Sequence, residues 1–175
     1  MTLGESRMIT TGYVRTMAAY NAEMNRRIYT GAATLPDAVR QVDAGVFFGS
    51  LHGTLCHLLW ADRMWMSRFD GWERPSATVQ ESPRLIADFA QLQQARGAAD
   101  VRLCEWADGV SQSWLDGETV WFSGITRSER RAPTGGLVVH MFNHQTHHRG
   151  QAHAVLTRYG VDPGDTDLWL VVPSV

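Results

Sequence analysis

Apolar residues recur at helical spacing along most of the chain. They lie three and four positions apart over four long stretches, which glycine, proline and polar segments separate. Such spacing puts apolar side chains on one face of an α-helix. The pattern therefore predicts an all-α bundle, with long helices at about 11–30, 50–70, 82–115 and 134–160, and a short helical turn that residues 35–37 open.

Capping residues and helix breakers give the boundaries. Gly31 closes the first helix, and Ser50 is a good N-cap for the second. Ser82 followed by Pro83 is a start signal for the third helix, which Gly97 is expected to bend or interrupt. The fourth helix is expected to begin at residue 134 or 135.

Two segments do not follow the helical pattern. The β-prone run 119–122 predicts a small hairpin or an irregular crossover between residues 118 and 131. Residues 161–175 are expected to form an irregular extension whose Leu168, Trp169 and Leu170 pack back on the bundle. The sequence shows no internal repeat, low-complexity tract or second domain, so residues 1–175 are interpreted as one domain.

The composition excludes several classes of protein. With 175 residues, 44% of them apolar and 19% charged, the chain fits a globular protein with a proper core. All 16 basic residues are arginine, and the absence of lysine excludes a Schiff-base lysine, a pyridoxal-phosphate anchor and a phosphate-loop lysine. A net charge of −2 and a pI near 6.4 provide no basic field, so no nucleic-acid partner is expected.

No membrane segment and no disulfide framework are expected. The longest apolar runs are far shorter than a membrane span, and the first residues lack the apolar region of a signal peptide, which predicts a cytoplasmic protein with no membrane partner. Cys56 and Cys104 are 48 positions apart without CxxC spacing, so neither a disulfide framework nor a zinc ribbon is indicated.

Histidines are concentrated in the fourth predicted helix, where five of the seven lie between His140 and His153. At about 100° per residue, His144 and His148 stand one turn apart on the same side of the helix, and their ring nitrogens can converge on one point. His147 is offset from them, and His153 lies on a different face. Burying two imidazoles without partners would cost about 1 to 3 kcal/mol each, and a bound metal ion would remove that cost.

A metal site in a bundle needs a further ligand from a facing helix. His52 and His57 in the second helix are the candidates, and helical pitch alone does not choose between them, although His52 is expected to be more exposed. Asp62 falls in the middle of that helix's apolar stripe. It is a candidate acceptor that orients a ligand imidazole, or else it bonds Arg63, Arg26 or a backbone group.

Three sequence runs resemble the DinB family of bacterial damage-inducible proteins. They are YNAEMNRRIY at 20–29, FFGSLHGTLCHLLWAD at 47–62 and FNHQTHHRGQ at 142–151, and the last contains the specific motif HxxxHRGQ. The resemblance implies a four-helix bundle of up-down-down-up topology, usually a homodimer, with a divalent metal ion held by three histidines. Carried over by motif, the metal ligands would be His57, His144 and His148.

The resemblance also suggests a type of chemistry. Family members bind zinc or nickel, and relatives in the superfamily include S-transferases that use mycothiol or bacillithiol and a mycothiol-dependent maleylpyruvate isomerase. Three histidine ligands leave a coordination position open, where a thiol would lose its proton and attack an electrophile. The resemblance therefore implies a metal-dependent enzyme with a stress-response role, an S-transferase acting on a small-molecule thiol and an electrophilic substrate.

Two other functions stay open at this point. In a metal-dependent hydrolase, a water activated by the ion would be the nucleophile, with Asp62 or a nearby acid as the base. In a protein without catalytic activity, the ion would stabilise the bundle or the site would hold a ligand.

Overall fold

The chain is mostly helical and carries one small antiparallel sheet. The computed structural model describes residues 7–124 and 126–172. In these residues the elements are α1 (Thr11–Ala33), α2 (Asp37–Gln41), α3 (Leu51–Phe69), η1 (Ser82–Arg84), α4 (Phe89–Gly109), α5 (Gln112–Leu115), β1 (Glu118–Ser123), β2 (Ser128–Pro133), α6 (Thr134–Arg158) and α7 (Leu168–Val171).

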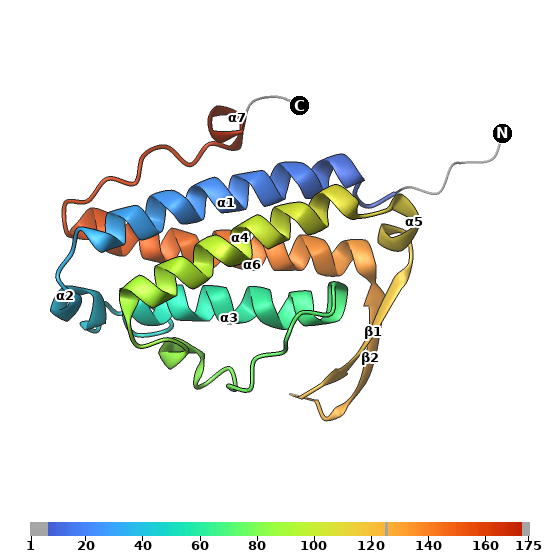
Figure 1. The fold of residues 1–175 in the computed structure, drawn as a ribbon, viewed down its shortest axis with the longest axis horizontal. Helices are drawn as coiled ribbons and strands as arrows, with labels where there is room; N and C mark the ends of the chain where they lie inside the picture. The colour runs from blue at the N-terminus through green and yellow to red at the C-terminus, as the bar shows by residue number, and fades with distance from the viewer. Residues whose placement is uncertain (1–6, 125, 173–175) are drawn as a thin grey trace.

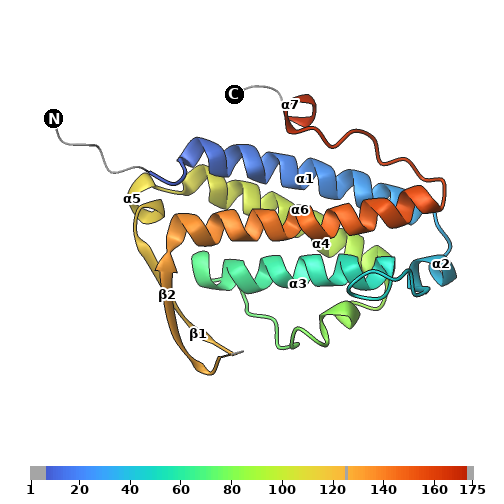
Figure 2. The same cartoon turned by 180° about the vertical axis from the view of Figure 1, so that it is seen from behind.

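The four long helices α1, α3, α4 and α6 lie side by side, as Figures 1 and 2 show. Helix α1 packs against α4 and α6, and α3 packs against the same two helices. Helices α1 and α6 run in one direction, whereas α3 and α4 run in the other. Their apolar stripes meet in a shared core that includes Val14, Ile28, Leu55, Leu58, Leu92, Leu103, Val138, Phe142 and Leu156.

Side-chain caps explain where two of these helices begin. The Thr10 hydroxyl accepts a hydrogen bond from the Tyr13 amide at 3.2 Å at the start of α1. The predicted cap Ser50 accepts from the Gly53 amide at 3.0 Å at the start of α3. Each cap satisfies an amide that has no carbonyl partner within its own helix.

The prediction of one continuous third helix from Ser82 to Leu115 is wrong. The chain forms only the short turn η1 at Ser82, and α4 starts seven residues later, where the Asp88 carboxylate caps the Gln91 amide at 2.8 Å. Helix α4 ends at Gly109, and Ser111 caps the separate short helix α5. Gly97 lies inside α4 and does not interrupt it. The caps Asp88 and Ser111, and not the Ser82-Pro83 signal, therefore mark where α4 and α5 begin.

The small hairpin predicted before the last helix is confirmed. Strands β1 and β2 pair in antiparallel register from Glu118 with Pro133 to Ser123 with Ser128. The hairpin extends from one end of the helices and leads directly into α6 (Figure 1). Helix α6 begins at Thr134, one of the two predicted starts.

The C-terminal extension runs back along α1 (Figure 1), but its apolar residues do not pack as expected. Leu168, Trp169 and Leu170 are 40%, 75% and 50% exposed. Polar contacts attach the extension instead: the Tyr20 hydroxyl donates to the Thr166 carbonyl at 2.6 Å, and the Arg27 guanidinium donates to a neighbouring carbonyl. Residues 173–175 of the predicted extension lie outside the described residues.

A helix that crosses a bilayer must be both long and continuously apolar. None of the helices in residues 7–124 and 126–172 combines the length and the apolar character that a membrane crossing requires.

Candidate metal site

Three histidines from two helices meet at one point. His57 comes from α3, and His144 and His148 come from α6; the ligand nitrogens that they offer all lie within 4.8 Å of one another. The Nε2 atoms of His57 and His144 are 3.1 Å apart. These are the three residues that the resemblance implied as metal ligands.

Local structure on both helices brings the histidines together. His144 and His148 are one helical turn apart, and their ring centroids are 4.5 Å apart. On α3, His57 is covered by the Phe48 ring, which stacks on it at a centroid distance of 3.6 Å. The loop that carries Phe48 comes close to α3 because residue 53 is glycine: a Cβ there would lie 2.5 Å from the Phe48 carbonyl oxygen.

Two of the three imidazoles have a hydrogen-bond partner on the nitrogen that faces away from the cluster. His57 Nδ1 lies 2.8 Å from the hydroxyl of Ser82, the first residue of η1. His148 Nδ1 lies 2.8 Å from Gln151 Oε1, one turn further along α6. Both contacts leave the Nε2 atom directed at the centre of the cluster.

Burial keeps the three imidazoles uncharged. Desolvation, with smaller contributions from His144 and His148, lowers the pKa of His57 to about 3. Desolvation also lowers the pKa of His144 to about 4, and it lowers the pKa of His148 despite the hydrogen bond to Gln151. Neutral imidazole is the form that binds a metal ion, so the cluster is in its ligand form at neutral pH.

The remaining histidines of α3 and α6 do not join the cluster. His52, which was expected to be exposed, is 3% exposed, and its Nε2 donates to the Ile86 carbonyl at 2.8 Å. The exposure prediction is therefore wrong, because the segment after η1 covers the start of α3. His140 and His147 are exposed, and His153 is half-buried.

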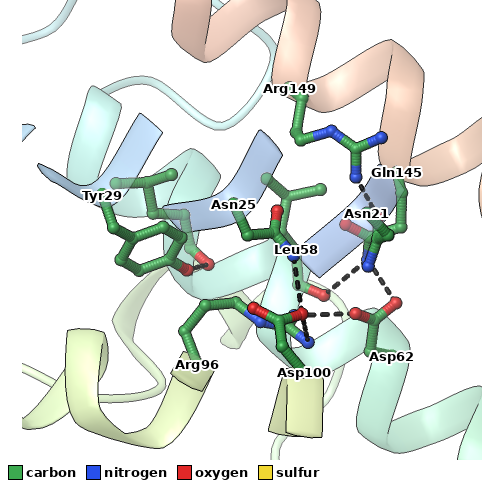
Figure 3. A network of polar contacts seen from close by, with 10 residues as sticks. Asn21, Asn25, Tyr29, Leu58, Asp62, Arg96, Asp100, Gln145 and Arg149 are labelled. Carbon is green, nitrogen blue, oxygen red and sulfur yellow. Dashed lines mark hydrogen bonds and ion pairs between the residues drawn. The ribbon is translucent and has the colours of Figure 1, made fainter. Parts of the chain in front are cut away.

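Asp62 lies in a buried polar network in the core (Figure 3), and in the described residues it forms no hydrogen bond with His57, His144 or His148. Within the described residues, its carboxylate accepts hydrogen bonds from Arg96, at 2.7 Å, and from the Gln145 amide. The interpretation of Asp62 as the acceptor that orients a ligand imidazole therefore has no support in the geometry. Arg26, one of the alternative partners considered for it, pairs with Glu23 on α1.

The network extends beyond this carboxylate and joins all four long helices (Figure 3). Arg96 of α4 also lies 2.8 Å from Asp100, whose carboxylate accepts from the Asn25 amide of α1 at 2.9 Å. Arg149 of α6 donates to the Asn21 side chain of α1. The network thus compensates the buried charge of Asp62 with a guanidinium from another helix.

Sequence reasoning missed Ser82 and Phe48 as parts of the site. Ser82 was interpreted as the start of a helix, and Phe48 only as part of a family motif. Both lie in segments outside the long helices, where periodicity gives no information about which side chain reaches a site. No local signal in the sequence could have placed the Ser82 hydroxyl against His57.

The donor set and its spacing fit a divalent metal ion. Two nitrogen ligands at about 2.1 Å from a tetrahedral ion lie about 3.4 Å apart, close to the 3.1 Å between the Nε2 atoms of His57 and His144. At that distance two nitrogen lone pairs repel each other unless a proton or a cation lies between them. The arrangement could therefore hold a divalent ion, of the type that imidazole ligands favour.

Comparison with known proteins gives a family match over nearly the whole chain. Residues 8–172 match the family model described as the DinB family. Neither the curated proteins nor the solved structures contain a significant match.

Proposed function

Because the chain belongs to the DinB family, we propose that it is a metal-dependent enzyme whose divalent ion, zinc or nickel, is bound by His57, His144 and His148. The observation that carries the proposal is the convergence of three buried or half-buried ligand nitrogens from α3 and α6. The proposal includes the up-down-down-up four-helix bundle that the family resemblance implies, and a cytoplasmic role in the stress response.

The residues of the site have three roles in this proposal: some would bind the ion, some orient the ligand rings, and one excludes water. The three imidazoles provide neutral nitrogen ligands, and Ser82 and Gln151 hold two of the rings in place. Phe48 excludes water from one face of His57. These three ligands would leave a further coordination position on a divalent ion, where the ion would lower the pKa of a thiol or a water molecule.

The substrate class that we propose is a small-molecule thiol together with an electrophile. In this transfer the sulfur forms a bond to an electrophilic carbon. In a substitution the leaving group departs with the electrons of its bond and the thiol proton passes to solvent, whereas in an addition the double bond opens and its other atom takes up the proton. Three uncharged imidazoles would leave the charge of a bound ion available to stabilise a thiolate, and equally a hydroxide, so the ligand set is compatible with both reactions.

Asp62, the base considered for a hydrolase, is not placed to act on a water molecule at the histidine cluster. Asp62 is fully buried and forms an ion pair with Arg96, so it has no access to a water molecule at the histidine cluster. A hydrolase would need another acid close to the three histidines. This observation favours the thiol reaction over hydrolysis.

The binding experiment uses the purified chain after dialysis against a chelator. Zn²⁺ and Ni²⁺ are titrated in competition with a chromophoric chelator, and one ion per chain is expected. His148→Ala should lower the affinity by at least about 100-fold, whereas the control His153→Ala, whose ring lies near the Thr157 hydroxyl further along the same helix, should leave it unchanged. Equal affinity of the wild type and the His148→Ala variant would reject the site.

Activity is then tested with the metal-loaded chain. Several low-molecular-weight thiols are combined with an electrophilic aromatic halide and, separately, with an ester. Conjugation that is lost in the His148→Ala variant is the expected result. Ester hydrolysis without thiol consumption would favour the hydrolase. A large fall in melting temperature on chelation, with neither reaction, would indicate a metal ion that only stabilises the fold.

A further inference from the structure

The Ser82 hydroxyl has only one hydrogen, and its two neighbours decide where that hydrogen lies. Ser82 Oγ is 2.6 Å from the Val79 carbonyl oxygen and 2.8 Å from His57 Nδ1. A carbonyl oxygen can only accept, so the hydroxyl donates its hydrogen to Val79. Its contact with the imidazole is then a hydrogen bond only if His57 Nδ1 carries a proton and donates it to Ser82.

We propose that Ser82 is a positioning residue that fixes His57 as the Nδ1–H tautomer, so that the Nε2 lone pair faces the metal site before any ion arrives. The inference rests on the proposed metal-binding function and adds a residue to it. A neutral imidazole has one N–H, so a proton held at Nδ1 leaves Nε2 as the acceptor or ligand atom. The hydrogen bond also fixes the orientation of the ring.

Burial makes this choice of tautomer strict. Ser82 is fully buried and His57 is 2% exposed. If the His57 imidazole flipped, no water molecule would replace its hydrogen bond to Ser82. The Phe48 ring stacks on one face of His57, with 3.6 Å between the ring centroids, and restricts rotation of the imidazole. The position of Ser82 is itself fixed, because its backbone amide donates to the Thr78 carbonyl at 3.0 Å.

The same reasoning assigns the proton of His144 in the metal-free protein. If His57 Nε2 carries a lone pair, the 3.1 Å contact with His144 Nε2 requires that His144 donate from its Nε2. His144 Nδ1 is buried and has no hydrogen-bond partner in the described part of the chain. When both Nε2 atoms bind one ion, His144 must give up its Nε2 proton and take one at Nδ1. His57 keeps its tautomer.

Histidine ¹⁵N spectra of the metal-free wild type test the proposal directly. Long-range ¹H–¹⁵N correlations distinguish protonated from unprotonated ring nitrogens, and the His57 signals are assigned from their loss in a His57→Gln variant. A proton on Nδ1 of His57 is expected. A proton on Nε2 in the wild type would overturn the proposal without any variant of Ser82. This measurement stands even if the protein binds no metal, so its outcome is separate from the outcome of the proposed function.

Two serine variants then separate the contact with His57 from the loss of a hydroxyl that donates to a backbone carbonyl. Ser82→Ala should give a mixture of His57 tautomers and lower the Zn²⁺ affinity by roughly 10- to 100-fold. Ser67→Ala is the matched control, because the Ser67 hydroxyl also donates to the carbonyl three residues earlier, Met64, at 2.8 Å, and contacts no histidine in the described residues. It should change neither measurement. An unchanged His57 tautomer in a folded Ser82→Ala variant would overturn the positioning role.

Discussion

Asp62 and Arg96 form an ion pair in the core, with 2.7 Å between Oδ2 and Nη1 and side chains that are 0% and 2% exposed. Removing one partner of such a pair leaves an uncompensated buried charge. We expect Arg96→Leu to lower the free energy of unfolding by about 3 to 5 kcal/mol, measured by urea denaturation followed by circular dichroism. The control Arg26→Leu breaks an exposed pair with Glu23 and should change stability little. An Arg96→Leu variant as stable as the wild type would contradict a charged pair.

The network also predicts that Asp62 supports the fold and not the metal site. Because its carboxylate bonds Arg96 and Gln145, Asp62→Asn should lower the melting temperature and change the Zn²⁺ affinity by less than about twofold. Both quantities are measured on the same preparation, by thermal denaturation and by chelator competition. A fall in affinity of 10- to 100-fold with the histidine cluster intact would restore the interpretation of Asp62 as an imidazole-orienting residue.

Asp100 makes stability depend on pH in a defined window. Burial raises the pKa of Asp100 to about 6 despite the neighbouring Arg96, against about 3.9 in an unfolded chain. At a pH between these two pKa values, Asp100 is more protonated in the folded state than in the unfolded chain. Its contribution to the free energy of unfolding therefore falls as the pH rises from 4 to 6. Asp100→Asn removes this titration. The stability of the variant relative to wild type should therefore rise across pH 4 to 6 and then level off, in urea titrations at a series of pH values. A flat or falling difference would show that the pKa is not raised.

Two glycines inside helices should respond in opposite ways to alanine. A Cβ at residue 53 would lie 2.5 Å from the Phe48 carbonyl oxygen, so Gly53→Ala should destabilise the protein by about 1 to 3 kcal/mol and displace the loop that covers His57. A Cβ at residue 97 meets no atom within 4 Å, so Gly97→Ala should stabilise α4 by about 0.5 to 1 kcal/mol. Denaturant unfolding of both variants gives the sign of each change in the free energy of unfolding. A Gly53→Ala variant at least as stable as the wild type would show that the close approach of the loop does not require glycine, and a less stable Gly97→Ala variant would contradict the open space at residue 97.

The homodimer remains a prediction from the family resemblance and from the number of apolar positions. Large apolar side chains at Phe47, Phe122 and Trp169 are at least 62% exposed in the single chain, and such surface is often covered by a second subunit. Light scattering at micromolar concentration should give close to twice the chain mass of 19.6 kDa. A mass near that of one chain would exclude a stable dimer.

The sequence by itself determined those features that depend on neighbours a few positions away. The spacing of His144 and His148 is set by the helical pitch, so their shared face follows from the order of residues alone. Apolar periodicity likewise located the long helices, and the cap Ser50 set the start of α3. Where two local signals competed, as at Ser82 and Asp88, the sequence alone could not decide which one would start the helix.

Only the tertiary structure decided which distant side chains meet. Helical pitch did not choose between His52 and His57, and only the family resemblance favoured His57. The packing of α3 against α6 and η1 directs the His57 ring to the site and the His52 ring to a backbone carbonyl. The partner of Asp62 is Arg96, 34 positions later, and the ring of His57 contacts the hydroxyl of Ser82, 25 positions later. Such contacts depend on how whole helices and loops pack, because only the packed core fixes the relative positions of segments far apart in the chain.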